Sequence, residues 1–501
     1  MMRTSQLQNS DTAARLLTGI AGLDTILAGG LTRDRLYVVE GEPGTGKTTL
    51  ALQFLQEGVR NGERVVYVTL AETMVELQAV AQSHGWLLDG ITVKEIIPDE
   101  NVLAAEQQYT MFHPSEVEMG STLKQILDVV DHMQPTRIVI DSLSELQLMA
   151  ESPLRYRRQV LGLKQYFSTR SCTVLLLDDC SATNSDLQVR SVAHAVIALD
   201  LIAQTYGTER RKLRVVKYRG VAYRGGRHDY KIARGGLTVY PRLVASHTRS
   251  TRRFKQLESG LPVLDTLLGG GLEEGTSTLI SGPAGAGKSS LAAQFVNAAT
   301  QRGERAAMFL FEEAANNLMN RSRGLNMDLA GAIDAGMLSI QQIDPAEMSP
   351  GEFTHTVCAA AADGAKVIVI DSLNGYLKAM PDERFLTTHL HELLTFLGQA
   401  GVATILVGVQ QGMIGSHMTT SIDASYIADN VLMLRYFEMD GAVQQAISVF
   451  KKRGSMHERT IRRYFMDQGG IHVGEVLKGL HGILTGVPTP IDTHEPSPVA
   501  D

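Results

Sequence analysis

The sequence predicts an α/β protein of two tandem domains, each with a mainly parallel β-sheet flanked by helices. Two observations predict this fold. The first is an internal repeat that keeps one register over several short motifs. The second is the pattern inside each repeat, where apolar runs of strand length alternate with glycine turns and stretches of helical period. Strands that alternate with helices form parallel sheets covered on both faces.

The repeat is clearest in its spacing. Asp24 and Asp265 close two similar segments and are 241 residues apart, and the lysines of two glycine-rich loops, Lys47 and Lys288, are separated by the same interval. The tripeptide Gly-Glu-Arg also recurs at this interval. A period of this length indicates duplicated domains and excludes a solenoid of short repeats.

The repeat also sets the expected boundaries. The linker is rich in Arg, Ser and Thr, and the C-terminal tail holds four prolines, which is typical of a segment without a packed core. The expected parts are a first domain at 1–245, a linker at 246–256, a second domain at 257–480 and a flexible tail at 481–501. In the first domain we expect strands at 36–39, 65–70, 137–140 and 174–177, and helices at 49–60 and 74–83.

Composition excludes several classes of protein. The 501 residues carry a formal net charge of −7 at a sequence pI of about 6.1, so no global basic field favours nucleic-acid binding. The three cysteines form no C-x-x-C pair, which disfavours a disulfide framework and suits a reducing cytoplasm. The N-terminus lacks the apolar core of a signal peptide, and no apolar run is long enough to span a bilayer. We therefore expect a cytoplasmic protein without a membrane or nucleic-acid partner.

Two glycine-rich loops carry the strongest chemical signal in the chain. The runs GEPGTGKT at 41–48 and GPAGAGKS at 282–289 both fit G-x-x-x-x-G-K-[ST], and each follows an expected strand and opens an expected helix. In this motif, backbone N–H groups close around the β-phosphate at a helix N-terminus, and the lysine reaches the β- and γ-phosphate oxygens. We expect ATP to bind through Gly41, Gly44, Thr45, Gly46, Lys47, Thr48 and Thr49, and through Gly282, Gly285, Ala286, Gly287, Lys288, Ser289 and Ser290.

A Mg²⁺ ion is expected with each bound ATP. The hydroxyls of Thr48 and Ser289 are the ligands that the two loops offer to the metal. An acidic residue at the end of a second apolar strand holds such a metal through water, and Asp141 and Asp371 stand at such strand ends. The fourteen histidines include no H-E-x-x-H or similar cluster, so no further metal is expected.

Hydrolysis or phosphoryl transfer also requires a carboxylate that orients or deprotonates the nucleophile. The candidates are Glu72 in the first half and Glu312 with Glu313 in the second. At the repeat interval, Ala71 corresponds to Glu312 and Glu72 to Glu313, and adjacent strand residues point to opposite faces. If Glu312 faces the nucleotide, the first site has lost its base. If Glu313 faces it, both sites keep one.

A lysine–arginine pair follows later in each half. Lys217 and Arg219 correspond to Lys451 and Arg453, and residues two apart share one face of a strand. Such a pair can neutralise γ-phosphate charge, in its own subunit or across a subunit boundary. An exposed edge strand is the alternative interpretation.

Together these motifs resemble the KaiC family, the double-domain bacterial clock ATPases of the RecA-like superfamily. The resemblance spans about residues 18–490 and rests on both glycine-rich loops, V-T-L-A-E-T, F-E-E, two I-D-S-L runs, K-Y-R-G, K-K-R-G and G-I-L-T-G-V-P. It implies two RecA-like domains and a homohexamer with ATP between subunits, in which each lysine–arginine pair acts on the neighbour's ATP. It also implies a first domain that is chiefly an ATPase, a second domain that is an autokinase and autophosphatase, and regulatory protein partners at the C-terminal tail.

The chain departs from the family pattern at two places. Ala71 stands where the family usually has the first glutamate of a pair, which bears on hydrolysis in the first domain. In the phosphoacceptor region, alignment from the preceding Ser-His pair gives Thr419 and Thr420, whereas alignment back from the following strand gives Ser425 and Tyr426. The acceptor candidates therefore stay open.

The leading functional hypothesis is a hexameric ATPase with Ser/Thr autokinase activity, acting in signalling or timing. A second hypothesis, favoured by Ala71 and the ambiguous acceptors, is an ATP-gated scaffold with slow turnover. A third, a RecA- or DnaB-like DNA motor, shares the core fold, but fold alone does not decide function and the net charge of −7 disfavours it.

Overall fold

The computed structural model describes residues 15–96, 114–150, 152–179, 186–204, 206–244, 255–378, 386–410, 426–483 and 489–490. They form two compact units that divide between Arg242 and Leu243. The acceptor candidates Thr419, Thr420 and Ser425 lie outside the described residues, as does most of the expected linker. Among the described residues, no helix is long and apolar enough to cross a membrane.

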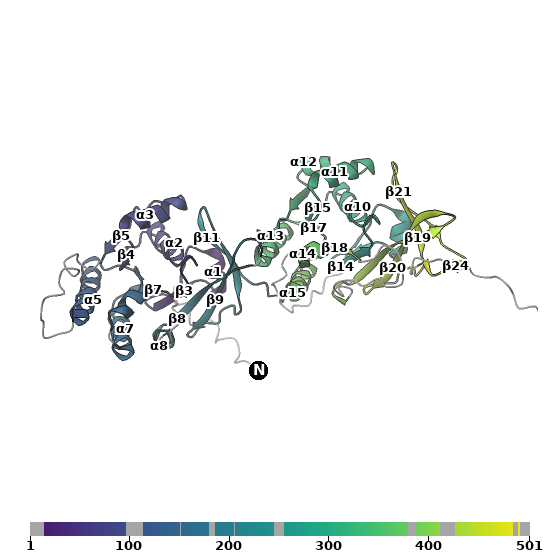
Figure 1. Ribbon diagram of the computed structural model, residues 1–501. Coiled ribbons are helices and arrows are strands. Elements are labelled where there is room, and N and C mark those ends of the chain that lie inside the picture. Colours follow the sequence, from purple (N-terminus) through teal and green to yellow (C-terminus); the bar gives the residue numbers. More distant parts are fainter. Residues whose placement is uncertain are drawn as a thin grey trace, which may run out of the picture. The chain divides into compact units, whose positions relative to one another are not determined.

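The first unit is built around one nine-stranded sheet with the order β11-β10-β9-β8-β3-β7-β6-β4-β5 (Figure 1). The six strands from β8 to β5 are parallel, and β9, β10 and β11 extend the sheet in antiparallel pairing. The bounds are β3 Leu36–Gly41, β4 Val65–Thr69, β5 Ile91–Glu95, β6 Arg137–Asp141, β7 Thr173–Asp179, β8 Ala195–Ile202, β9 Arg210–Tyr218, β10 His228–Ala233 and β11 Gly236–Tyr240.

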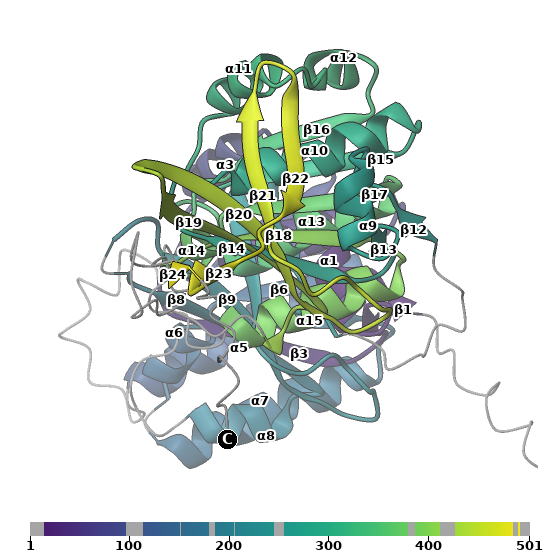
Figure 2. The ribbon, with the colours of Figure 1, turned by 90° about the vertical axis from the view of Figure 1, so that its right-hand side faces the viewer.

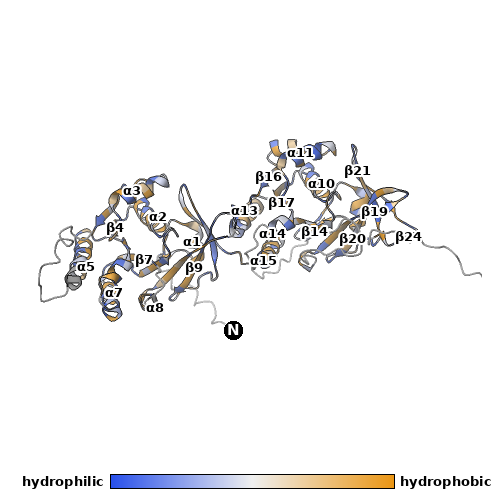
Figure 3. Ribbon diagram, viewed as in Figure 1, coloured by the Kyte–Doolittle hydropathy of each residue, from blue (hydrophilic) through white to orange (hydrophobic). Residues whose placement is uncertain are grey.

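Helices cover both faces of this sheet because neighbouring strand residues point to opposite sides. Val39 packs in the cluster that includes α2 and α3, whereas Val38 packs in the cluster that includes α5 to α8. Figure 3 shows the apolar strands between the helices. The remaining bounds are β1 Arg15–Leu16, α1 Ala21–Ile26, β2 Leu31–Thr32, α2 Lys47–Arg60, α3 Met74–Ser83, α5 Pro114–Met133, α6 Leu143–Leu148, α7 Pro153–Ser168 and α8 Asp186–Val192.

The second unit repeats this plan with the order β16-β15-β17-β18-β14-β19-β20-β21-β22. Its strands are β14 Ser277–Gly282, β15 Arg305–Leu310, β16 Leu338–Gln342, β17 Ala365–Asp371, β18 Ala403–Val409, β19 Asn430–Met439, β20 Ala442–Lys452, β21 Arg462–Asp467 and β22 Gly470–Val476, with the short pairs β12 Gln256–Leu257 with β13 Leu272–Glu273 and β23 Leu480–His481 with β24 Thr489–Pro490. Its helices are α9 Pro262–Leu267, α10 Lys288–Gln301, α11 Ala315–Gly324, α12 Leu329–Asp334, α13 Pro350–Ala362, α14 Leu373–Lys378 and α15 Leu386–Gln399. Figure 2 shows the hairpin of β21 and β22 beside α11.

The expected fold class is confirmed, and local sequence explains several element bounds. The four expected strands of the first unit are β3, β4, β6 and β7, and the two expected helices are α2 and α3. Helix α3 begins after Thr73 because the Thr73 side chain and the Glu76 carboxylate cap each other's backbone N–H groups. At the start of the expected tail, Ile483 is 2% exposed and packs against Phe437 of the second unit.

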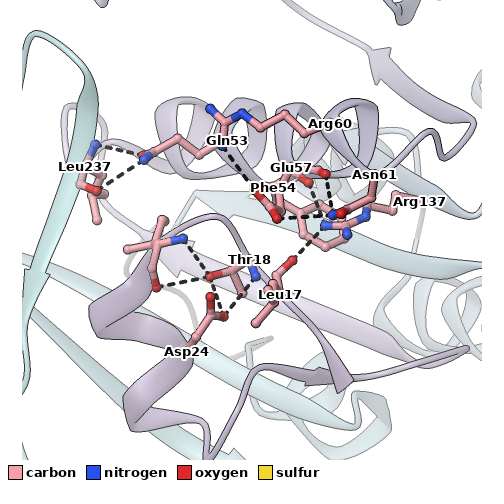
Figure 4. A network of polar contacts seen from close by, with 11 residues as sticks. Leu17, Thr18, Asp24, Gln53, Phe54, Glu57, Arg60, Asn61, Arg137 and Leu237 are labelled. Carbon is pink, nitrogen blue, oxygen red and sulfur yellow. Dashed lines mark hydrogen bonds and ion pairs between the residues drawn. The ribbon is translucent and has the colours of Figure 1, made fainter. Parts of the chain in front are cut away.

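Arg137 is the largest fully buried side chain and ties β6 to α2 (Figure 4). Its Nη1 donates to the carbonyls of Leu17 at 2.8 Å and Phe54 at 2.9 Å, and its Nε is paired with the Glu63 carboxylate. The guanidinium also stacks 4.8 Å from the centre of the Phe54 ring. Since α2 begins at the lysine of the first glycine-rich loop, this network fixes the helix on which that loop depends.

Candidate active sites

Both glycine-rich loops connect a central parallel strand to a helix. The first joins β3 to α2 and the second joins β14 to α10. Gly46 and Gly287, directly before the helices, have φ of +92° and +89°, a conformation that glycine adopts without strain. A Cβ on Gly46 would also lie 2.4 Å from Ile232 Cδ1. The loops therefore present a helix N-terminus behind a close turn of backbone, which is the form that binds phosphate.

The loop lysines are held inside their loops. Lys47 is 8% exposed and its Nζ donates to the carbonyls of Gly41 at 2.8 Å and Glu42 at 3.1 Å. Lys288 is 6% exposed and donates to the Pro283 carbonyl at 2.7 Å, and burial lowers the pKa of its ammonium. Each lysine thus offers its charge at the centre of the loop, which fits the phosphates of ATP.

Four of the expected ATP-binding residues turn their side chains inward. The Thr45 hydroxyl donates to the Glu42 carbonyl at 2.7 Å, and the Thr49 hydroxyl lies 3.2 Å from His84 Nε2. Ala286 and Ser290 are 0% and 3% exposed. Of the side chains in the two loops, these four are therefore turned away from the space in front of the loop, and what they offer a phosphate there is their backbone N–H groups.

A tyrosine from the antiparallel strands touches each loop. The Tyr230 hydroxyl on β10 donates to the Thr45 carbonyl at 2.6 Å. The Tyr464 hydroxyl on β21 donates to the Gly287 carbonyl at 3.4 Å. Both loops are therefore hydrogen-bonded to the part of their sheet that continues beyond the parallel strands.

The strand-end aspartates lie beside the loop hydroxyls. Burial raises the pKa of Asp141 and of Asp371, and the nearby hydroxyls of Thr48 and Ser289, respectively, oppose this shift. Tyr67 donates to Asp141 Oδ2 at 2.5 Å, whereas Asp371 Oδ2 is buried without a hydrogen-bond partner. A hydroxyl next to a carboxylate with an unsatisfied oxygen fits a hard divalent cation such as Mg²⁺.

The two adjacent glutamates of the second unit have different surroundings. Glu313 forms a bidentate ion pair with Arg321 of α11, with N–O distances of 2.5 and 2.8 Å. Glu312 is exposed, lies against Gly375 and acts electrostatically on the ammonium of Lys288. The arginine therefore engages Glu313, whose charge acts on Asp371, and leaves Glu312 as the carboxylate whose charge acts on the loop lysine.

In the first unit, the corresponding glutamate lacks this arginine. At the repeat interval, Arg321 corresponds to Val80, so Glu72 has no such partner there. Its Oε2 is buried without a hydrogen bond. The pKa of Glu72 is raised to about 7, mainly by burial and then by the charges of Asp141, Glu76 and Asp179, whereas Lys47 opposes the shift. Glu72 thus faces the first loop, although it aligns with Glu313.

Asp179 is a site residue that is absent from those expected from the sequence. It ends β7, next to β3 in the sheet, and its Oδ1 lies 2.6 Å from Lys47 Nζ. The available signal is the run Leu-Leu-Leu-Asp-Asp, an acid at an apolar strand end like Asp141. In the second unit, Val409 occupies this register position opposite Gly282, so the ion pair belongs to the first site alone among the described residues.

The lysine–arginine pairs lie away from the loop of their own unit. Lys217 pairs with Val196, which aligns with Val38, three residues before Gly41 and about 10 Å from it along the strand. Its Nζ donates to the Arg190 carbonyl, and Arg219 Nη2 donates to the Ser191 carbonyl at 2.6 Å. In the second unit, Lys451 donates to the Ala428 carbonyl at 2.7 Å, and Arg453 to Tyr426 at 3.3 Å. Both pairs thus lie toward the amino-terminal ends of the parallel strands, whereas the loops follow the carboxyl-terminal ends.

Replacing Glu72 by glutamine is expected to raise the melting temperature of the nucleotide-free first unit at pH 8. Because the pKa of Glu72 is raised from 4.5 to about 7, the folded state takes up a proton in this window, and the stability it provides is lost as the pH rises through 7. Glutamine carries no such charge. The stabilisation should therefore shrink as the pH falls toward 5.

Trp86 is the only tryptophan of the chain and lies in the first unit, where its ring is 4.8 Å from that of His84. Its fluorescence therefore reports this unit alone. Glu76→Gln is the control, because hydrogen bonds from Thr73 lower the pKa of Glu76 and the variant should gain no stability. Equal melting of wild type and Glu72→Gln at pH 8 would contradict the expectation.

Comparison with known proteins places the same motifs in one family. A family model described as "ATPase: KaiC" matches residues 16–244 and again 257–478. Three relatives cover nearly the whole chain. The circadian clock oscillator protein KaiC of Synechococcus elongatus is 27% identical over 507 residues, which are 99% of this chain and 96% of the relative.

The other two relatives have similar scores. The circadian clock oscillator protein KaiC of Acaryochloris marina is 26% identical over 498 residues, covering 97% of this chain and 94% of the relative. The circadian clock protein KaiC3 of Synechocystis sp. is 26% identical over 494 residues, covering 96% of each. The family match thus extends over both units.

Proposed function

The chain belongs to the KaiC family of ATPases, and on this premise we propose that it is a homohexameric, Mg²⁺-dependent ATPase with Ser/Thr autokinase and autophosphatase activity in its second domain. The observation that carries the proposal is the pair of complete loops, each with a lysine buried in the loop and a hydroxyl beside a strand-end aspartate. The relatives' names support a role in circadian-type timing or another signalling process.

Bound Mg-ATP supplies the phosphoryl group, and the residues of each loop bind and orient it. Lys47 and Lys288 exchange their carbonyl contacts for phosphate oxygens. Thr48 with Asp141, and Ser289 with Asp371, hold the metal. The loop glycines keep side chains away from the phosphates, so backbone N–H groups stay available.

The general base differs between the two sites in this proposal. In the first site it is Glu72, whose pKa of about 7 suits a proton acceptor near neutral pH. In the second it is Glu312, because Glu313 is engaged by Arg321. The first site then keeps a general base despite Ala71, because Glu72 at the next position takes this role.

The lysine–arginine pairs support assembly into a ring. They lie at the sheet edge away from their own loop, so their charge is useful to a nucleotide only across a subunit boundary. Contact between unlike faces of identical subunits closes into a ring, and the family resemblance implies a hexamer. In this ring Lys217 and Arg219, and Lys451 and Arg453, act on the neighbour's ATP. We further propose domains at 1–245 and 257–480, and regulatory partners at the tail.

Incubation of the purified protein with Mg-ATP tests this function. We expect released phosphate and, by intact mass and phosphopeptide analysis, phosphate on residues within 416–426, with a Lys47→Ala/Lys288→Ala variant as the inactive control. Phosphate release from unmodified protein would remove the autokinase and leave the ATPase. Neither product after long incubation would favour the second candidate, an ATP-gated scaffold, which the ambiguous acceptor region of the sequence also favours.

A further inference from the structure

Lysine and arginine side chains from α7 and from the end of β9 converge on the end of α8 in the first unit. Lys164 of α7 donates from Nζ to the Val192 carbonyl at 2.8 Å. Lys217 and Arg219 donate to the two preceding carbonyls, as described above. His194 follows directly, and its ring makes edge contacts with Tyr37 and Tyr218, with centroids 5.9 and 5.6 Å away. We call Lys164, His194, Lys217 and Arg219 the cation surface.

This surface gathers positive charge that nearby groups reinforce. The charged groups that shift the pKa of Lys164 and of Lys217 are all other cations, and together with burial they lower both values. Burial lowers the pKa of His194 to about 4, and Arg35 and the cations of the surface contribute to this shift. Like charges held together in this way repel one another, and a bound anion relieves the repulsion.

The second unit keeps the pair but changes its surroundings. Arg453 donates to the Tyr426 carbonyl as Arg219 does to Ser191. Lys164 follows buried Leu163 of α7, which precedes β7; at the same place before β18, buried Leu393 of α15 is followed by Leu394. The backbone N–H of His194 donates to Leu36, and at the matching place the N–H of Asp429 donates to Ser277.

Asp429 then partly neutralises the second pair, because its Oδ1 lies 3.4 Å from Arg453 Nη1. The first unit therefore has an additional lysine and lacks this carboxylate. These two exchanges make the first pair more positive than the second, although both pairs keep the same backbone contacts.

The acidic residues around the glycine-rich loops of the two units differ in the opposite direction. The first loop has Glu72, Asp141 and Asp179 around its lysine. The second has Glu312 and Asp371, with Val409 at the position of Asp179 and with Glu313 paired to Arg321. In a head-to-tail contact, the cation edge of one copy meets the loop edge of the next. The unit with more cations at one end of its strands thus has more carboxylates without an arginine partner at the other, and this complementarity points to a second copy of the chain as the partner.

We propose that Lys164 and His194 extend the Lys217–Arg219 pair into an oxyanion-binding surface for the phosphates of a nucleotide held by the first loop of a second copy. Lys164 adds a positive charge. His194 stands where the second unit has Asp429, the carboxylate that partly neutralises the second pair. The inference rests on the ring of the proposed function and deepens it. We therefore expect the first site to bind nucleotide more tightly than the second.

The test measures the affinity of the full-length protein for a fluorescent ATP analogue, in a Lys288→Ala background that leaves only the first loop competent. Lys164→Leu and His194→Asp introduce the residues of the second unit. Each is expected to weaken binding about fivefold to tenfold at low salt, and less at high salt because screening reduces such effects. Lys124→Leu on the exposed side of α5 is the matched control. Affinity equal to that of the control would overturn the inference.

Two further measurements separate folding and assembly from the inference itself. Melting followed by Trp86 fluorescence identifies a variant that fails to fold, and Lys164→Gln then replaces Lys164→Leu, with the same expected loss. Mixing Lys164→Leu copies with Lys47→Ala copies should restore tight binding at part of the sites, because the second variant contributes an intact cation surface to its neighbours. Failure to restore it would overturn the placement across the boundary.

The proposed ring can also fail independently of this inference. If Lys217→Ala leaves the affinity of the first site unchanged, the ring itself is wrong. If Lys217→Ala weakens binding but Lys164→Leu and His194→Asp do not, the ring stands and only the extension to these two residues falls.

Discussion

Replacing Glu312 by glutamine is expected to lower the rates of ATP hydrolysis and of phosphoryl transfer at the second site about 100-fold or more, the usual loss when a general base is removed. Glu313→Gln is expected to lower them only severalfold. Glu313 is engaged in the bidentate pair with Arg321, whereas Glu312 faces the ammonium of Lys288. Released phosphate and phosphorylated protein are to be measured in a Lys47→Ala background, which silences the first loop.

The pair of variants serves as its own control, since each removes one carboxylate from neighbouring positions of the same turn. A reversed order of the two effects would make Glu313 the base and would restore the strict alignment with Glu72. Wild-type rates in both variants would remove both glutamates from the mechanism.

Replacing Arg137 by alanine is expected to destabilise the first unit by about 3–5 kcal/mol, the cost of breaking a buried charged network by removing one partner. The side chain is 1% exposed, and its loss removes a donor from the carbonyls of Leu17 and Phe54 and the buried partner of the Glu63 carboxylate, which keeps its contact with Arg33 at the surface. The measurement is urea-induced unfolding followed by Trp86 fluorescence, which reports this unit alone.

Lys94→Ala is the matched control, because Lys94 lies on β5 of the same sheet and is exposed. It should change stability by less than about 0.5 kcal/mol. In the second unit, Val367 stands at the position of Arg137, so β17 folds without a buried cation there. A loss below about 1 kcal/mol for Arg137→Ala would show that the network contributes little net stability.

The sequence predicts the parts of this protein that local pattern determines. The parallel strands are apolar runs buried on both faces, and the loops combine a strand, a glycine turn and a helix start, so both were predictable. The 241-residue register also placed Glu72 opposite Glu313. It could not show which glutamate faces the loop, because that depends on the arginine that α11 brings back to Glu313.

Contacts between distant segments were equally inaccessible. The pairing of Asp179 with Lys47 requires β7 and β3 to be neighbours in the sheet, and Lys164 meets Lys217 only because α7 and β9 pack on the same end of α8. No spacing in the sequence reports such convergence. The acceptor candidates Thr419, Thr420 and Ser425 lie outside the described residues and stay predictions.

The tyrosines that touch the two loops give the proposed ring a route for cooperativity. Tyr230 links the first loop to β10, which pairs with β9, the strand that carries Lys217. Tyr464 links the second loop to β21, which pairs with β20, the strand that carries Lys451. We expect a rearrangement of the loop around its nucleotide to be transmitted, through this tyrosine, to the strand that presents lysine and arginine to the adjacent subunit. We therefore expect that nucleotide binding at one site of the proposed ring changes the affinity of the next, which cooperative binding curves would show.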